Sequence, residues 1–236
     1  MMVDFHSHIL PGIDDGSDCV DTSLKMLALE KAQGITHVVA TPHFYPNRDN
    51  PAAFLARRAK AMEALAARMT PELPQVIPGA EVAFFRGMSQ SEALVDLTLG
   101  KSKFLLVELP PAPWPEEVYR ELAMLQVSRG LTPVVAHIDR YITRWNYRHI
   151  LPGLAGLPIQ ANGEFFCNPF TAAFARRLLE EGVIHLLGSD CHNLSDRKPN
   201  LGPVLEKIRK KSGPKALEAL DDCQGYILQT VNGVGR

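Results

Sequence analysis

The sequence lacks the features that mark membrane and secreted proteins. No apolar run approaches the roughly 18 residues of a membrane-spanning helix. Asp4 and the histidines beside it stand where a secretory signal would carry a basic and then an apolar segment. The cysteines are few and scattered, without a Cys-x-x-Cys pair: Cys19, Cys167, Cys191 and Cys223. We therefore expect a cytoplasmic protein with reduced thiols and without membrane insertion.

The sequence also lacks an excess of charge of either sign. Its 236 residues hold 25 Lys and Arg against 26 Asp and Glu, a net charge of −1, without a basic block or acidic tail. Composition thus gives no argument for nucleic acid or an anionic membrane as a partner. Long linkers, repeats and low-complexity tracts are missing as well, and 46% of the residues are hydrophobic. We expect a single globular domain over residues 1–236.

What the chain does have is a regular alternation of strand-like and helix-like runs. Seven apolar runs read as strands, at residues 3–8, 35–40, 75–85, 104–108, 132–137, 158–162 and 183–188. Helices are predicted at about 21–33, capped by Asp18 or Asp21, then at 50–69, 89–97, 114–130 and 168–182, with two short helices at the end. Strands that alternate with helices predict a parallel α/β sheet, and seven such units favour a closed barrel.

The first strand ends in His6-Ser7-His8. Residues two apart on a strand lie on one side, so both imidazoles can face one point and bind a metal ion there. Asp14 and Asp15 follow in a loop that begins with Pro11-Gly12. Alone, the pattern is equally compatible with a solvated strand that carries two incidental histidines.

Six of the seven predicted strands place His, Asp or Glu at or just after their carboxyl ends. These residues are His6, His8, His43, Glu81, Glu108, His137, Asp190 and His192. In a parallel barrel those ends share one face, where active sites lie. Histidine and carboxylate without thiolate suit Mn²⁺, Zn²⁺ or Fe, and so many ligands suit two or three ions bridged by a carboxylate such as Glu81. Such a cluster predicts metal-dependent hydrolysis, of a phosphate ester above all.

Structural roles compete with this interpretation. Glu81 could be a turn residue, and Glu108 could pair with Arg120. Two further histidines, His37 and His185, lie early in their strands and so toward the other face of the barrel, and His149 lies in an irregular segment. We expect structural or solvated roles for these last three.

These blocks resemble a known family. The run from Asp4 to Ser17 (DFHSHILPGIDDGS) resembles the opening motif of the bacterial manganese-dependent tyrosine-protein phosphatases of the capsule-biosynthesis type (CpsB/CapC-like). These belong to the polymerase and histidinol phosphatase (PHP) superfamily. The further matching blocks are Ala40–His43, Gly79–Glu81, Leu106–Glu108, Ala136–Tyr141 and Gly188–Asn193, with Arg197 just beyond. The resemblance covers almost the whole chain, in order.

The resemblance implies a distorted (β/α)7 TIM-like barrel with a trinuclear metal centre, usually supplied with Mn²⁺. It implies the eight strand-end ligands named above, with Asp15 as a less certain ninth. Arg140 and Arg197 match arginines that hold phosphate in this family, although either could instead pair with Asp139 or Asp196. The implied substrate is a phosphotyrosine-containing protein, attacked by a metal-activated hydroxide. The family name further suggests a tyrosine autokinase of exopolysaccharide or capsule biosynthesis as partner.

Other functions stay open at this point. Cys191 and Arg197 have the Cys-x5-Arg spacing of cysteine-based tyrosine phosphatases, although the intervening residues hold no glycine. A small-molecule phosphoesterase of the histidinol-phosphatase type would use the same metal site. A polymerase-associated exonuclease would need a basic groove, which this sequence does not predict. A non-catalytic module that binds metal and phosphopeptide is a further alternative. The ending, residues 228–236, departs from the family and could border the mouth of the site.

Overall fold

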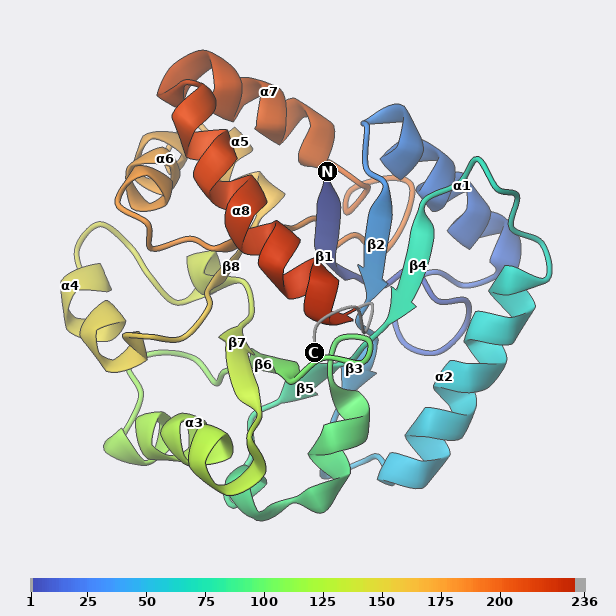
Figure 1. Cartoon of the computed structure of the whole chain (residues 1–236), viewed down its shortest axis with the longest axis horizontal. Helices are drawn as coiled ribbons and strands as arrows, with labels where there is room; N and C mark the ends of the chain where they lie inside the picture. Colours follow the sequence, from blue (N-terminus) through green and yellow to red (C-terminus); the bar gives the residue numbers. More distant parts are fainter. Residues whose placement is uncertain (1, 232–236) are drawn as a thin grey trace.

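The computed structural model describes residues 2–231 as a ring of parallel strands with helices around it (Figure 1). The strands are β1 (Val3–Ser7), β2 (His37–Ala40), β3 (His43–Phe44), β4 (Gln75–Pro78), β5 (Glu81–Ala83), β6 (Phe104–Glu108), β7 (Thr132–Val135), β8 (Gln160–Asn162) and β9 (Leu186–Gly188). The α-helices are α1 (Val20–Ala32), α2 (Pro51–Ala66), α3 (Glu116–Arg129), α4 (Tyr147–Ile150), α5 (Gly163–Cys167), α6 (Ala172–Glu180), α7 (Leu201–Ser212) and α8 (Pro214–Val231). Four 3₁₀ segments connect them: η1 (Met88–Gln90), η2 (Glu92–Leu97), η3 (Ile138–Arg140) and η4 (Leu151–Leu154).

The nine strands fill seven positions because two of them are interrupted. Thr41-Pro42 separates β2 from β3, and Gly79-Ala80 separates β4 from β5. β2 pairs with β4 and β3 with β5, so both halves run side by side. Proline has no N–H for the ladder. A Cβ at Gly79 would lie 3.0 Å from the side chain of Leu99. The prediction of one uninterrupted strand over residues 75–85 is wrong in this detail, because β4 ends at Pro78 and β5 begins only at Glu81.

Backbone hydrogen bonds close the ring where β7 meets β8 and where β9 meets β1. Val135 N donates to Pro158 O at 3.0 Å on one side. His8 N donates to Cys191 O at 2.9 Å, and Asp190 N to His6 O at 2.7 Å, on the other. Every strand pairing in the described chain is parallel. The predicted α/β fold with parallel strands is confirmed, and these bonds join its seven strand positions into a ring.

Most of the long helices were expected from the sequence, but several of their ends differ from the prediction. Asn50 caps α2 by accepting a bond from Ala53 N at 3.2 Å, as expected from an Asn-Pro start. α1, however, has Cys19 at its N-cap position, so the predicted caps Asp18 and Asp21 are wrong. α5 was not predicted, and α6 starts at Ala172 rather than at residue 168. The two final helices are not short, with 12 and 18 residues.

The last helix covers the end of the barrel where the strands begin. Leu228 of α8 belongs to the same buried cluster as Val3, Phe104 and Leu186, the first residues of β1, β6 and β9. In Figure 1, α8 crosses in front of the ring beside β1. The expectation that the ending borders the mouth is thus wrong for Leu228, while residues 232–236 lie outside the described residues.

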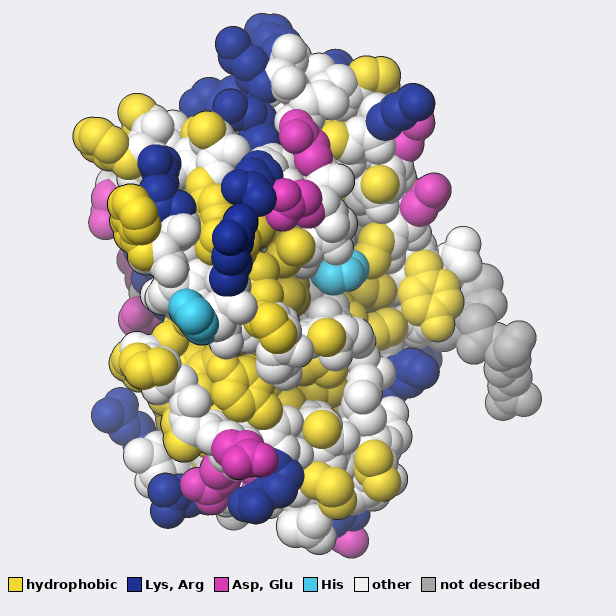
Figure 2. All heavy atoms as spheres, turned by 90° about the vertical axis from the view of Figure 1, so that its left-hand side faces the viewer, with side chains coloured by type: hydrophobic (Ala, Val, Ile, Leu, Met, Phe, Trp, Pro, Cys, Tyr) yellow, Lys and Arg dark blue, Asp and Glu magenta, His cyan; other side chains and the backbone are white. Residues whose placement is uncertain are grey.

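The surface mixes charge and apolar groups. Figure 2 shows the side of the molecule that carries α3, α4 and α6, where basic, acidic and apolar side chains alternate. Trp145 and Phe170 are more than four-fifths exposed. Within the described residues, no helix combines the length and the apolar character needed to cross a membrane.

Candidate active site

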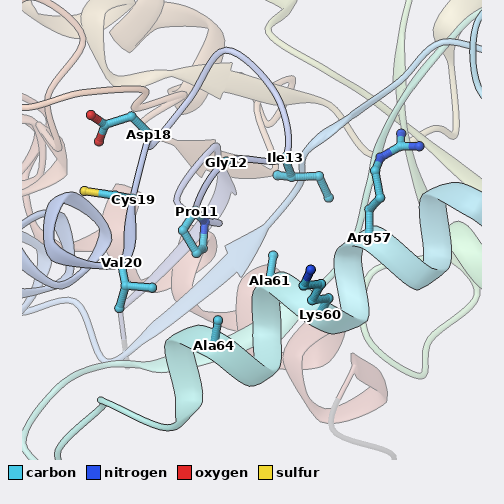
Figure 3. A pocket seen from close by; sticks show the side chains of 10 residues that line it. All are labelled: Pro11, Gly12, Ile13, Asp18, Cys19, Val20, Arg57, Lys60, Ala61 and Ala64. Carbon is cyan, nitrogen blue, oxygen red and sulfur yellow. The ribbon is translucent and has the colours of Figure 1, made fainter.

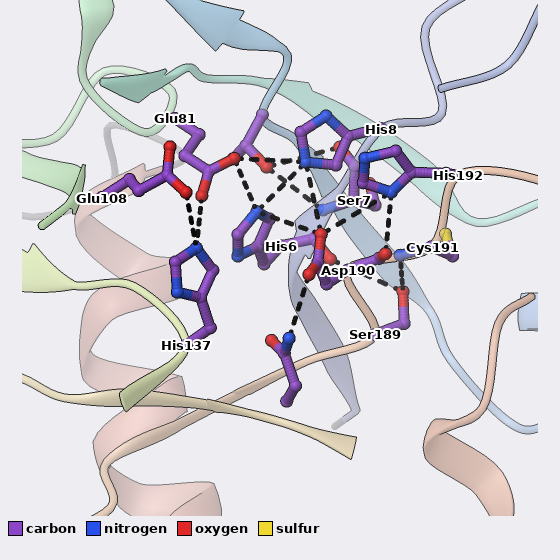
Figure 4. A network of polar contacts seen from close by, with 12 residues as sticks. His6, Ser7, His8, Glu81, Glu108, His137, Ser189, Asp190, Cys191 and His192 are labelled. Atoms are coloured by element: carbon purple, nitrogen blue, oxygen red, sulfur yellow. Dashed lines mark hydrogen bonds and ion pairs between the residues drawn. The ribbon is translucent and has the colours of Figure 1, made fainter. Parts of the chain in front are cut away.

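The structure brings the eight predicted ligands together at the carboxyl-end mouth of the barrel, and Figure 4 labels all of them except His43. They come from the ends of β1 and β6, the starts of the short strands β3 and β5, and the loops after β7 and β9. The residues are His6, His8, His43, Glu81, Glu108, His137, Asp190 and His192. Six of the seven barrel positions contribute. The arrangement is the one expected when parallel strands present their ends to a single face.

Glu81 occupies the centre of this cluster and is 1% exposed. Its Oε2 lies 2.9 Å from His43 Nδ1, 3.2 Å from His6 Nε2 and 3.3 Å from His8 Nε2. Its Oε1 lies 2.7 Å from His137 Nε2. Four imidazoles therefore share one carboxylate, which is the geometry expected of a bridging ligand.

Asp190 forms the second acidic centre and connects the histidines to two arginines. Its Oδ1 lies 3.5 Å from His8 Nε2, and it accepts a bond at 2.9 Å from Arg197 Nη2. Its Oδ2 accepts a bond at 2.6 Å from Arg140 Nη2. Asp190 has a backbone φ of 53°, and His137 has a φ of 31°. Non-glycine residues rarely adopt this region, and such strain clusters at functional sites.

The electrostatics favour charged carboxylates at the mouth. Burial disfavours the Glu81 carboxylate, yet the charge of His6 and the hydrogen bond from His137 hold its pKa well below the usual range. Burial also opposes ionisation of Asp190, and the neighbouring His6 and His8 lower its pKa nevertheless. Burial opposes a charge on His8, but bonds to Asp14, Asp190 and Glu81 raise its pKa well above the usual range. The two acids thus need positive charge beside them.

Divalent metal ions fit this need. His6 Nε2 and His8 Nε2 face each other at 3.2 Å, so the two nitrogens need a proton or a cation between them. Among the described residues, four buried atoms of the cluster make no hydrogen bond of acceptable geometry: Glu81 Oε2, His43 Nδ1, His137 Nδ1 and His192 Nε2. Nitrogen and carboxylate oxygen donors are the ligands that Mn²⁺, Zn²⁺ and Fe accept.

Seven of the nine expected ligands, all except His137 and Asp190, fall into three overlapping groups, in each of which the ligand atoms lie within 4.8 Å of one another. These are His8–Asp15–His43–His192, His6–His8–Glu81 and His43–Glu81–Glu108. Asp15 is 67% exposed, but its Oδ1 lies 3.5 Å from His43 Nε2 and 3.6 Å from His192 Nε2. The structure therefore brings the ninth expected ligand to the cluster as well.

Three polar residues that the sequence did not single out as site residues orient the ligands. Asp14 accepts a bond at 2.7 Å from His8 Nδ1 and one at 3.0 Å from His43 N. The Gln160 side-chain oxygen lies 3.2 Å from His6 Nδ1 and accepts a bond at 2.6 Å from His137 N. Asn162 Nδ2 donates to Asp190 at 3.0 Å. Such outer partners fix the ring orientation of histidine ligands and tune their basicity. Position offered a signal, because Gln160 and Asn162 occupy the one strand without an ionisable ligand.

The two arginines meet at Asp190 rather than at the acids beside them in the sequence. Asp139 instead accepts a bond from Asn162 N at 2.8 Å. Arg140 also approaches Glu108 at 3.5 Å, so Glu108 faces the site. Arg140 and Arg197 are 42% and 37% exposed and line a cavity of about 250 Å³ with Asp190. A guanidinium has five N–H donors, so both retain donors for an anion at the mouth.

The remaining histidines lie away from this cluster. His37 pairs with Val3 at the start of the sheet, and Thr36 Oγ1 lies 2.9 Å from its Nδ1. His185 precedes β9, and its Nδ1 accepts a bond from Ile159 N at 3.2 Å. His149 lies in α4. All three lie outside the cluster of potential ligands, as the sequence predicts, although His149 lies in a short helix rather than in an irregular segment.

Cys191 is fully buried on the far side of the ligand loop. Burial and then the charges of Glu30 and Asp4 raise the pKa of its thiol well above the usual range. A thiolate nucleophile needs a lowered pKa and access to substrate. The Cys-x5-Arg interpretation is therefore disfavoured.

A cavity of about 480 Å³ lies beside the site, between residues 11–20 and α2 (Figure 3). Its lining includes Ile13 and Arg57, which also line a neighbouring cavity of about 330 Å³ that contains Asp15 and His43. Cavities therefore continue from the cluster of potential ligands along the rim of the barrel.

The comparisons with known proteins decide the family. Residues 2–222 match the family described as capsular polysaccharide synthesis, CpsB/CapC. The chain belongs to this family. The tyrosine-protein phosphatase YwqE of Bacillus subtilis is 31% identical over 222 residues, which cover 90% of this chain and 85% of that protein. The tyrosine-protein phosphatase CpsB of Streptococcus pneumoniae is 28% identical over 93% of this chain and 94% of that protein.

The fold agrees with the family. A chain from the crystal structures of YwqE and CpsB, which are metal-dependent tyrosine phosphatases, matches with a TM-score of 0.79 and 26% identity over 98% of this chain and 94% of that chain. A phosphotriesterase homology protein from Escherichia coli shares the fold alone, with a TM-score of 0.56 and 14% identity over 93% of this chain and 95% of that chain. The resemblance recognised in the sequence motifs is confirmed.

Proposed function

We propose that this CpsB/CapC-family protein is a metal-dependent phosphatase that hydrolyses phosphotyrosine in proteins, in a single domain. The observation that carries the proposal is the mouth itself, where four imidazoles converge on buried Glu81 and two arginines converge on Asp190. The relatives that carry this name span nearly the whole chain.

In this proposal two or three divalent ions, Mn²⁺ by preference with Zn²⁺ or Fe as alternatives, bind at the mouth. The ligands are His6, His8, Asp15, His43, Glu81, Glu108, His137, Asp190 and His192. Bound ions supply an activated water and neutralise charge on the phosphoryl oxygens. Asp14 and Gln160 hold the ligand imidazoles in place from behind.

Arg140 and Arg197 bind the phosphoryl group of the substrate. Asp190 holds both guanidinium groups at the rim, where their remaining N–H donors match phosphate oxygens in a bidentate way. Positive charge placed there before the reaction stabilises the charge that develops in the transition state. The tyrosine hydroxyl has an ordinary pKa of about 10, so the phenolate can leave without a strong general acid.

The proposed partner is a bacterial tyrosine autokinase of exopolysaccharide or capsule synthesis. The family description supports the capsule part of this proposal. We also propose a cytoplasmic location. The four cysteines, all within the described residues, are free, as expected of a reducing compartment.

The experiment is phosphate release from a phosphotyrosine peptide with Mn²⁺, with and without a chelator, and with histidinol phosphate beside the peptide. We expect chelator-sensitive turnover that favours the peptide. Turnover of histidinol phosphate alone would keep the site and replace the substrate. Metal and peptide binding without turnover of either ester would replace the enzyme by a binding module.

A further inference from the structure

A cavity with aromatic walls opens beside the metal cluster. It has about 410 Å³ and is lined by Tyr45, Pro46, Asn47, Ala83, Phe84 and Phe85. Its walls are the residues that follow β3, the last residue of β5 and the two residues after it, so it belongs to the mouth of the barrel. The three aromatic side chains are half-buried, which leaves part of each ring for contact with another group.

The cavity is joined to the proposed ligands at two points. The Tyr45 ring stacks on the His43 ring, with centroids 5.1 Å apart and planes 26° apart. Phe84 N donates to the backbone oxygen of Glu108 at 2.8 Å. Tyr45 also lines the cavity that contains His43 and Asp15. An ester whose phosphoryl group lies at the metals can therefore reach the aromatic walls with the group next to its ester oxygen.

The chemistry of the walls selects among such groups. Apart from Asn47, the lining is aromatic or apolar, which disfavours a polar leaving group and favours a flat ring. Aromatic rings pack edge-to-face or offset against each other more favourably than area alone predicts. At one edge Arg48 lies over the Tyr45 ring, 5.4 Å from its centroid, which holds that ring in place.

We propose that this cavity, the aryl cavity, binds the aromatic ring of the substrate and makes the site selective for aryl phosphate monoesters. The proposal rests on the proposed function and adds to it the residues that recognise tyrosine, namely Phe84 and Phe85 with Tyr45. Aliphatic phosphate esters reach the same metals and arginines but leave the aryl cavity unused. Selection for phosphotyrosine thus lies outside the metal centre.

The test uses two non-hydrolysable probes, phenylphosphonate and methylphosphonate, on the Mn²⁺-loaded protein. Their affinities are measured by calorimetry and by inhibition of phosphate release. Because neither probe is hydrolysed, the difference between the two affinities reports what the aromatic ring contributes to binding. We expect phenylphosphonate to bind about tenfold more tightly. Phe84→Ala should remove most of this preference and leave the affinity for methylphosphonate unchanged. Phe170→Ala, a matched change of a ring that is 85% exposed and outside the cavity, should keep the preference.

The outcomes separate the alternatives. If Phe84→Ala weakens a phosphotyrosine peptide but not phenylphosphonate, the cavity binds a neighbouring residue of the peptide and the proposal is overturned. Equal loss for both phosphonates would mean damage to the metal site and would also overturn it. If Phe84→Ala does not fold by circular dichroism, Phe85→Ala carries the same expectation. If neither phosphonate binds and no phosphate ester is hydrolysed by the wild-type protein, the proposed function itself fails, and the aryl cavity with it.

Discussion

Two groups of buried acids lie next to strand β1, and they differ in what neutralises them. At the mouth, Glu81 and Asp190 face imidazole and guanidinium groups, and their pKa values are lowered. Behind the ligand loop, Asp4 and Glu30 face each other and Cys191, with their ligand atoms within 4.8 Å. Burial raises the pKa of both acids there, and the charge of Asp4 raises that of Glu30 further.

The difference teaches how one residue type acquires two roles. The acids at the mouth stay charged and demand cations, so they form a site. The raised pKa values of the pair behind favour a protonated carboxyl there. Asp4 also accepts bonds from Ser189 N at 2.9 Å, Ser189 Oγ at 2.5 Å and His6 N at 3.1 Å. These bonds tie β1, which carries His6, to the loop that carries Asp190. A Glu→Gln change should therefore lower activity strongly at the mouth and hardly at all in the pair behind it.

At the mouth, Glu81→Gln should have the largest effect. Removal of the charge that four imidazoles share should empty the metal site and lower kcat/KM for a phosphotyrosine peptide by at least about 100-fold. Metal content by elemental analysis and phosphate release check this. Glu63→Gln on the exposed surface of α2 is the matched control and should change neither. A fully active, metal-loaded Glu81→Gln protein would end the assignment of Glu81 as the shared ligand.

A smaller effect is expected one layer behind the ligands. Gln160→Leu removes the partner of His6 Nδ1 and His137 N, so both imidazoles lose their orientation. Metal affinity should fall about tenfold, and excess Mn²⁺ should restore kcat. A metal titration of activity measures both. The matched change Gln126→Leu on the exposed side of α3 should leave the titration curve unaltered. A loss of kcat that no Mn²⁺ concentration restores would mean that Gln160 stabilises the fold rather than orients the ligands.

The ligands at the mouth could be predicted from the sequence, because ionisable residues at the ends of parallel strands converge without any knowledge of packing. Gln160 could not be predicted from its residue type, since a neutral amide has no distinctive pattern, and only its place on the one strand without an ionisable ligand sets it apart. Glu30 could not either, because its partner Asp4 lies 26 positions earlier and only the packing of α1 on β1 brings them together. In the fold, Gly225 disfavours a long final helix, yet α8 continues through it while Leu220, Ile227 and Leu228 are buried on either side of it.

The smallest effect, and the sharpest contrast with Glu81, is expected for Glu30→Gln. A protonated glutamate and a glutamine have nearly the same shape and can both donate to Asp4, so activity should stay within about twofold of wild type at neutral pH.

The stability of the wild-type protein should depend on pH in a defined way. Since the folded pKa of Glu30 lies above its ordinary value of 4.5, its favourable contribution is complete below pH 4.5 and is lost as pH rises toward the folded pKa. Relative to Glu30→Gln, the wild-type protein should lose unfolding free energy as the pH rises over that interval. Urea unfolding of both proteins at several pH values and one fixed Mn²⁺ concentration measures the difference. Parallel pH profiles would mean that Glu30 ionises normally in the fold, and the contrast between the two acid groups would collapse.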